Sequence, residues 1–247
     1  SRGRPLSDEP FYIGYLPAAD PVCRRMALAA GIIWIIFGFA AISLSRTPRD
    51  LGHSQFGDDI ALSGIVVARP YPVLVAAPDH QHPKGRTLLL GGEGKHGAQD
   101  FADALDGRSA HLEGILIKRG DLDMALISSP DQLKPESAGH PAPQREHLRR
   151  WRLSGEICDG KCAAGAMRPG SGASHKACAN LCISSGLPPV LALGRPFEGR
   201  EVLILAGENG GPVPGELLDR VGILVTLEGD ARRLGDAIIF QVGNSIR

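Results

Sequence analysis

The sequence predicts a mainly β fold: one N-terminal transmembrane helix, then two tandem OB-like small β-barrels, the second with a Cys-rich insertion. Three observations predict it. Residues 26–45 form one uncharged apolar run. The rest of the chain alternates short apolar segments with Gly, Pro and Asp, which is typical of strands and tight turns. These segments recur in the same order in two stretches, and only the second stretch contains a cluster of four cysteines.

The apolar run at 26–45 reads MALAAGIIWIIFGFAAISLS and has arginines on both sides, among them Arg25 and Arg46. About 20 apolar residues match the roughly 30 Å hydrocarbon core of a bilayer. Only a helix satisfies its own backbone in lipid, so the run is expected to be helical there. A signal peptide would start the chain and have a shorter apolar core. Here polar, Pro-containing residues 1–25 precede the run, which favours a transmembrane helix.

The charges that flank the helix predict its orientation. The N-terminal flank carries four arginines, two of them directly before the helix, whereas the other flank carries two arginines and soon becomes acidic: Arg2, Arg4, Arg24 and Arg25 precede the helix, and Arg46, Arg49, Asp50, Asp58 and Asp59 follow it. Basic flanks favour the cytoplasmic side. We therefore expect a cytoplasmic segment at 1–25, a single pass through a bacterial inner membrane, and a periplasmic C-terminal body.

Internal similarity predicts the division of the body into a first barrel (58–127), a linker (128–144) and a second barrel (145–247). Six segments match in order: 62–65 with 153–156, 72–75 with 189–192, 88–93 with 203–208, 114–117 with 222–225, Gly120-Asp121 with Gly229-Asp230, and 124–127 with 237–240. About five strands in roughly 80 residues suggest a closed barrel of the OB type, with a β-sandwich as the alternative.

Short connections complete this predicted scaffold. Residues 101–105 and 216–218 are candidates for a short helix or turn between the third and fourth strands of each copy. The segment 128–144 is rich in Pro and Ser and has few large apolar residues, so it is predicted to be a linker.

The Cys-rich insertion at 158–187 is the most informative segment for function. The matching place in the first copy holds only the short turn 68–71. Loops on rigid scaffolds commonly carry function. A helix is predicted over 175–183, with Ser174 as its N-cap and Gly186 beyond its end. Its residues 175, 178 and 182 would share one face.

Three interpretations of the four cysteines remain open. The preferred one is two disulfides that staple the loop, Cys158 to Cys182 and Cys162 to Cys178, since an exported segment permits them. The second is a metal or iron–sulfur site with ligands Cys158, Cys162, His175, Cys178 and Cys182. A set of three Cys and His175 would suit zinc, whereas thiolates with Met167 would suit cuprous copper. The third is a redox-active dithiol, although the usual Cys-x2-Cys spacing is absent.

The segment 155–189 also resembles a motif of uncharacterised bacterial membrane-anchored proteins. The resemblance is carried by Lys161-Cys162, Gly165-x-Met167-x-Pro169-Gly170, His175-x2-Cys178-Ala179-x2-Cys182 and Gly186-x-Pro188-Pro189, together with the stretch 11–17 before the helix. Proteins of that kind occur beside membrane redox enzymes with haem, Rieske or molybdenum subunits. The resemblance implies no particular activity.

The leading functional prediction is a non-catalytic, single-pass accessory subunit of an inner-membrane complex, respiratory or otherwise electron-transferring. Its partners would be other membrane subunits and the lipid bilayer, with Gly31 and Gly38 as close-approach positions on the helix. The sequence offers no catalytic constellation and predicts no resident cofactor. The balance of 27 basic and 27 acidic residues argues against nucleic acid as a partner. The alternative is a periplasmic metal- or cofactor-handling protein that uses the Cys-rich insertion.

Overall fold

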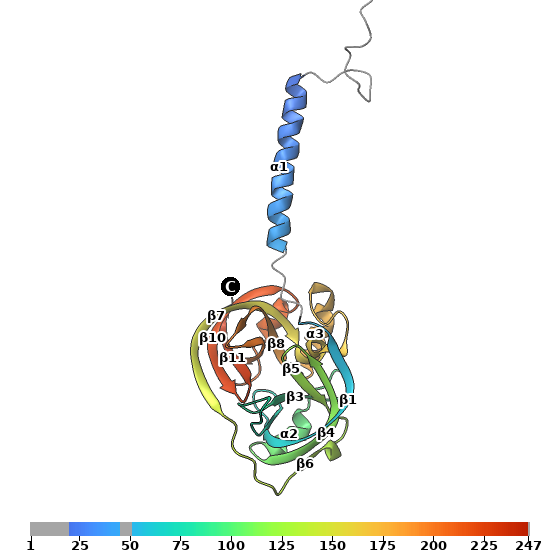
Figure 1. Cartoon of the computed structure of the whole chain (residues 1–247), viewed down its shortest axis with the longest axis vertical. Helices are drawn as coiled ribbons and strands as arrows, with labels where there is room; N and C mark the ends of the chain where they lie inside the picture. The colour runs from blue at the N-terminus through green and yellow to red at the C-terminus, as the bar shows by residue number, and fades with distance from the viewer. Residues whose placement is uncertain (1–19, 45–50, 247) are drawn as a thin grey trace, which may run out of the picture. The chain divides into compact units, whose positions relative to one another are not determined.

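The computed structural model describes residues 20–44 and 51–246 and divides the chain into two units, 1–47 and 48–247. The first unit contains helix α1 (Asp20–Leu44) (Figure 1). Its stretch Pro21–Ile42 is long and apolar enough to cross a membrane, and none of it is buried. The predicted apolar helix is therefore present and begins six residues earlier than residue 26. The predicted cytoplasmic segment lies, up to residue 19, outside the described residues, as does the stretch 11–17.

The first half of the second unit contains six strands whose pairings return to the first strand. They are β1 (Ser54–Val67), β2 (Val73–Ala76), β3 (Thr87–Gly91), β4 (Ser109–Arg119), β5 (Leu122–Leu126) and β6 (Leu133–Pro135). The sheet order is β1-β2-β3-β5-β4-β6, and β1 pairs with β4 as well. The pairing of β3 with β5 is parallel and the others are antiparallel. Helix α2 (Gln99–Ala102) and a 3-10 turn (Asp103–Leu105) occupy the predicted helical connection.

The second half is a closed five-stranded barrel. Its strands are β7 (Arg145–Asp159), β8 (Pro189–Phe197), β9 (Arg200–Gly207), β10 (Leu224–Leu234) and β11 (Ala237–Ile246). They close in the order β10-β11-β9-β8-β7. As in the first half, the third and fifth strands pair in parallel and the first strand pairs with both the second and the fourth. A 3-10 turn (Gly215–Arg220) precedes β10, where the sequence predicts a short connection.

The shared strand pairings correct part of the predicted internal alignment. Gly120-Asp121 forms the turn between β4 and β5, but Gly229-Asp230 lies inside β10. The equivalent turn in the second half is Gly235-Asp236, between β10 and β11. The parallel pairing is alike in the two halves: Leu89 on the third strand lies opposite Met124 on the fifth, and Ile204 lies opposite Ile239 in the same way. The sequence match is displaced because apolar strands resemble one another, whereas backbone pairing fixes one register.

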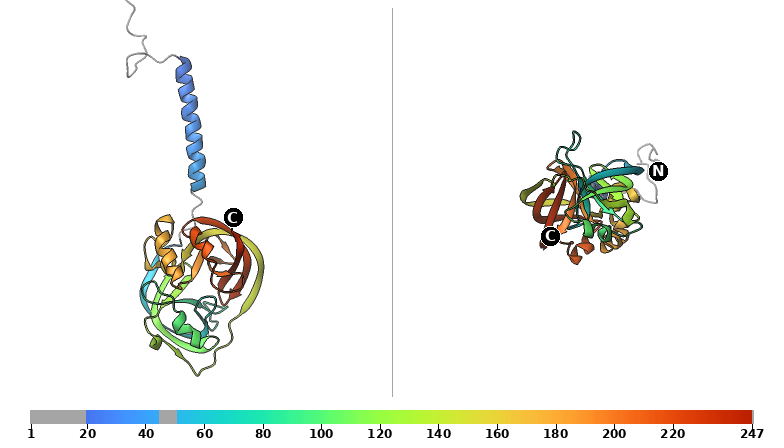
Figure 2. Two further views of the ribbon diagram at one scale, coloured as in Figure 1. Left: turned by 180° about the vertical axis from the view of Figure 1, so that it is seen from behind. Right: turned by 90° about the horizontal axis from the view of Figure 1, so that it is seen from below.

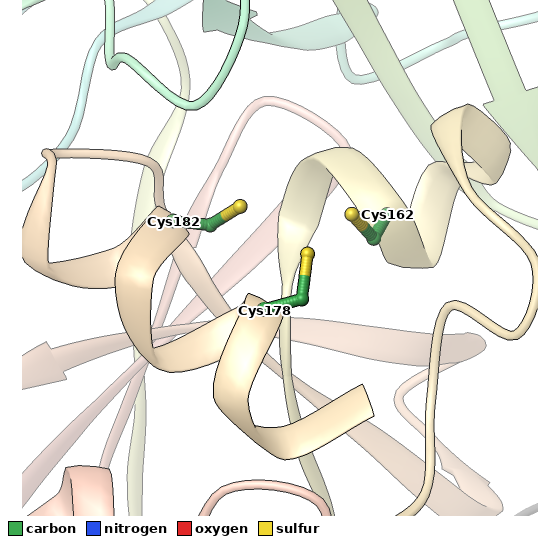
Figure 3. Close-up of side chains that lie close together, drawn as sticks. All are labelled: Cys162, Cys178 and Cys182. Atoms are coloured by element: carbon green, nitrogen blue, oxygen red, sulfur yellow. The ribbon is translucent and has the colours of Figure 1, made fainter. Parts of the chain in front are cut away.

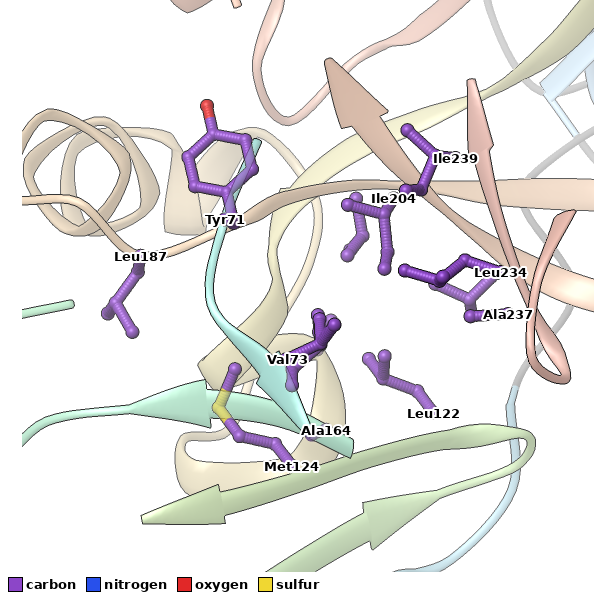
Figure 4. Close-up of a cluster of buried hydrophobic side chains, with 14 of the residues drawn as sticks. Tyr71, Val73, Leu122, Met124, Ala164, Leu187, Ile204, Leu234, Ala237 and Ile239 are labelled. Atoms are coloured by element: carbon purple, nitrogen blue, oxygen red, sulfur yellow. The ribbon is translucent and has the colours of Figure 1, made fainter. Parts of the chain in front are cut away.

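Buried side chains form one core in each half and a third core shared by both. Strand β2 shows the arrangement: Leu74 lies in the core of the first half, whereas Val73 and Val75 on its other face lie in the shared core. Figure 4 shows the shared core, where Met124 from the first half and Ile204 and Ile239 from the second are drawn. Strands buried on both faces read as continuous apolar runs, which explains why the sequence lacks clean alternation there.

The two halves also exchange contacts through their last hairpins. Asp236, in the β10–β11 turn, accepts the backbone N–H of Thr87 at the start of β3, with a distance of 2.8 Å. Asp121, in the β4–β5 turn, accepts the backbone N–H of Glu201 at the start of β9, with a distance of 2.7 Å. Arg200 forms ion pairs with both aspartates. A turn of each half thus binds the backbone at the start of an interior strand of the other half. Figure 2 shows the two sets of strands side by side.

The Cys-rich insertion lies between β7 and β8, as predicted, but it is not a peripheral loop. It contains a helical turn (Cys162–Ala166), a 3-10 turn (Ala173–His175) and helix α3 (Lys176–Ser184). Cys158, at the end of β7, lies in the shared core, and the side chains that the insertion itself contributes there are Cys162, Ala163, Ala164, Cys182 and Leu187. An insertion that supplies core residues belongs to the folded body, and the first half packs directly against it.

Two local expectations are also corrected. The N-cap of α3 is His175, without a side-chain cap, and not Ser174, because a 3-10 turn extends the helical segment toward the N-terminus. Gly186 does end the helix with a positive φ of 91°. In the predicted linker 128–144, Leu133 is buried and begins β6, so this part of the linker joins the sheet of the first half.

Candidate metal site in the cysteine-rich insertion

Three of the four cysteines of the insertion converge. The Sγ atoms of Cys162, Cys178 and Cys182 all lie within 4.8 Å of one another. Figure 3 shows their sulfur atoms pointing toward a common point, with Cys162 on the helical turn and the other two on α3. Cys178 and Cys182 are four residues apart on a helix and therefore share a face, as the sequence predicts. Cys162 and Cys182 are buried, whereas Cys178 is half-buried.

The thiols of this three-cysteine cluster interact with one another. A hydrogen bond to Cys182 and burial raise the pKa of Cys162, so this thiol keeps its proton. The same hydrogen bond from Cys162 lowers the pKa of Cys182, against the opposing effect of burial. Of the two thiols, Cys182 is therefore the one that ionises more readily. Soft, negatively polarised sulfur atoms at this separation are suitable ligands for a thiophilic metal ion.

Two lysines bring positive charge to the cluster. Lys95, from the loop after β3, donates a hydrogen bond from Nζ to Sγ of Cys178 over 2.8 Å. This contact raises the pKa of Lys95. Lys161 is buried, and its Nζ donates to the carbonyl oxygens of Gly92 and Gly94 at 2.7 and 2.8 Å. Burial lowers the pKa of Lys161, whereas nearby Cys182 and Cys162 oppose that effect.

The loop that carries Lys95 is fixed against the insertion by its backbone. The N–H of Gly97 donates to the carbonyl of Ser185 over 2.9 Å. A Cβ on Gly97 would lie 2.3 Å from the carbonyl oxygen of Gly186, so only glycine permits this approach. In the sequence, residues 91–95 are a glycine-rich stretch without cysteine or histidine. The cluster is therefore completed by a residue 83 positions from Cys178, which sequence spacing could not indicate.

Two buried polar residues, Asp159 and His175, lie next to Cys162. Asp159 is completely buried; its Oδ1 accepts the backbone N–H of Cys162 at 2.9 Å, and its Oδ2 lies 3.2 Å from Nε2 of His175. Ligand atoms of Asp159, Cys162 and His175 also lie within 4.8 Å of one another. His175 is thus next to Cys162 but is held by Asp159. His175 therefore lies outside the group of three sulfurs and belongs to a second group of possible ligands, with Asp159 and Cys162.

Cys158 is not part of the three-cysteine cluster. Its Sγ donates to Oε1 of buried Glu156 over 3.4 Å, and Glu156 also accepts the backbone N–H of Gly172. Burial, followed by the charge of Glu156, raises the pKa of Cys158, which keeps this thiol protonated.

The two predicted disulfides remain a prediction. All four cysteines of the insertion are free thiols. The predicted pairing joins Cys158 to Cys182 and Cys162 to Cys178. The fold instead directs Cys158 toward Glu156 and places Cys162 within reach of both cysteines of α3.

Comparisons with known proteins found no relative of this chain. No protein-family model matches the chain, and neither the curated proteins nor the solved structures contain a match.

Proposed function

We propose that this chain is a membrane-anchored protein that binds one thiophilic metal ion through Cys162, Cys178 and Cys182. The observation that carries the proposal is the convergence of three sulfur atoms from two separate helical segments within 4.8 Å of one another. The cluster is anchored by groups that touch its members: Asp159 holds the backbone of Cys162 and Lys95 contacts Cys178. Such supporting groups commonly orient metal ligands.

A metal site fits this arrangement better than the alternatives. A disulfide would use two of the three thiols and leave the third beside it without a partner. Iron–sulfur clusters usually require four cysteine ligands, and the fourth cysteine of the insertion, Cys158, is directed to Glu156. Three thiolates with an open or weakly filled fourth position suit zinc or cuprous copper.

The wider organisation of the protein is part of this proposal. We take the body to be two tandem barrels of the OB type, joined by the shared core, with the metal site in a loop of the second. The matching strand pairings of the two halves support that interpretation. The apolar helix α1 supports a single-pass anchor. The charge asymmetry around it favours a periplasmic body.

Metal analysis of the full chain tests the proposal. The protein would be extracted in mild detergent without oxidants, and its intact mass measured under non-denaturing and denaturing conditions. We expect one metal ion for each chain, and three thiols protected from alkylation until a chelator removes the ion. A mass lowered by loss of thiol hydrogens, with no bound metal, would instead establish disulfides and refute the proposal.

A second proposal is the accessory-subunit role in an inner-membrane redox complex. It is supported by the fully exposed apolar surface of α1, on which neither Gly31 nor Gly38 would meet another atom within 4 Å if a Cβ were added. Small residues allow helices to approach closely in lipid. Co-purification of stoichiometric membrane subunits in mild detergent is expected. A chain that runs as a lone monomer after gentle extraction would count against this role.

A further inference from the structure

We propose that the site is built for cuprous ion and that Met167 supplies its fourth sulfur ligand. The inference rests on the proposed function, since it assigns the metal and the completing ligand to the same three-cysteine cluster. It adds a residue outside that cluster and a preference for one class of ion.

The sulfur atom of Met167 contacts one thiol of the cluster, that of Cys178. It directly follows the helical turn Cys162–Ala166, and its Sδ lies 3.8 Å from Sγ of Cys178, which donates to it. Yet the Met167 side chain is 45% exposed. Met124, by contrast, is fully buried in the shared core, where a methionine is expected. An exposed thioether therefore contacts Cys178, the one half-buried thiol of the cluster.

The chemistry of a thioether indicates which ion this arrangement would take. A thioether is neutral and soft, and it binds cuprous copper, whereas zinc sites are completed by Cys, His, carboxylate or water. His175 is the nearby imidazole, but it is buried and its Nε2 faces Asp159. The carboxylate of Asp159 is held by the backbone N–H of Cys162 and by His175, whereas the thioether of Met167 contacts a sulfur atom of the cluster directly.

Positive side chains near the cluster offset part of the negative charge of the thiolates. Three thiolates around a monovalent ion leave two negative charges, which need nearby cations in a buried site. Lys95 contacts Cys178, and Lys161 precedes Cys162 in the sequence. The buried carboxylate of Asp159, which accepts the backbone N–H of Cys162, adds a negative charge to the same surroundings. Binding involves no electron transfer: each cysteine thiol that becomes a ligand releases its proton to solvent, copper stays monovalent, and Met167 donates a lone pair without losing a proton.

Competition titrations under anaerobic conditions test the inference on the full chain in detergent. Cuprous ion would be titrated against a chromophoric cuprous chelator, and zinc against a zinc chelator, for the wild type and Met167→Leu. Leucine keeps the size and apolar character of the side chain and removes only the sulfur. We expect the affinity for cuprous ion to fall by about tenfold or more, while zinc affinity is unchanged. Met124→Leu is the matched control and should change neither.

The outcomes separate the two proposals. If the wild type binds neither ion, the proposed function itself fails. If the wild type binds both ions and Met167→Leu binds each as tightly as the wild type, the metal site stands and the role of Met167 is refuted. X-ray absorption of the copper-loaded protein gives an independent readout: loss of one sulfur scatterer in Met167→Leu supports the inference, and an unchanged sulfur shell overturns it.

Discussion

Replacing Cys162 or Cys182 by serine is expected to abolish stoichiometric metal binding, whereas replacing Cys158 by serine is expected to preserve it. A serine hydroxyl does not ionise at neutral pH and is a hard ligand, so it cannot substitute for a thiolate. Loss of supporting groups alone typically weakens metal sites by 10- to 100-fold, so loss of a ligand should exceed about 100-fold. Cys158 lies against Glu156, to which a serine hydroxyl could also donate.

The measurement is metal content and affinity of the three purified variants, with far-ultraviolet circular dichroism to verify that each is folded. Cys158→Ser is the matched control, because it makes the same chemical change in the same buried insertion. Equal loss of metal in Cys158→Ser and Cys162→Ser would show that the fourth cysteine is a ligand. The four-cysteine site predicted from sequence would then replace the three-cysteine cluster.

Replacing the insertion 160–187 by a short turn is expected to prevent folding of the whole body. The first half closes the same hairpin with a short connection, so chain geometry alone permits the deletion. However, the insertion supplies Cys162, Cys182 and Leu187 to the shared core and Ile183 to the core of the second half. Fully burying one large aliphatic side chain contributes about 1.5–3 kcal/mol. Several such losses approach the 5–15 kcal/mol net stability of an ordinary domain.

Point substitutions give the graded version of this prediction. Leu187→Ala removes a fully buried side chain and is expected to lower the free energy of unfolding by about 2–5 kcal/mol. Leu181→Ala, on the exposed face of α3, should change it by less than about 0.5 kcal/mol. Chemical denaturation in detergent measures both. If the deletion variant folds and Leu187→Ala resembles Leu181→Ala, the insertion is an accessory to the fold, as the sequence alone suggests.

Local patterns in the sequence determined much of the architecture. The uncharged run 26–45 predicts an apolar helix because length and hydropathy are properties of a contiguous segment. Short apolar segments between Gly, Pro and Asp predict the strands, and helical spacing predicts that Cys178 and Cys182 share a face of α3. The closed barrel, the apolar helix and the position of the insertion are all present in the structure.

Only the tertiary structure decided which residues form the site. Cys158 and Cys162 look equivalent in the sequence. In the structure, Cys158 donates to Glu156, whereas the sulfur of Cys162 lies next to the sulfurs of the two cysteines of α3. Lys95 reaches Cys178 from the other half of the body. The register that pairs the turn at Gly235-Asp236 with the start of β3 likewise depends on long-range contact. Such choices depend on where strands close and which faces pack together, and these are set by pairings between residues far apart in the chain, which no local pattern encodes.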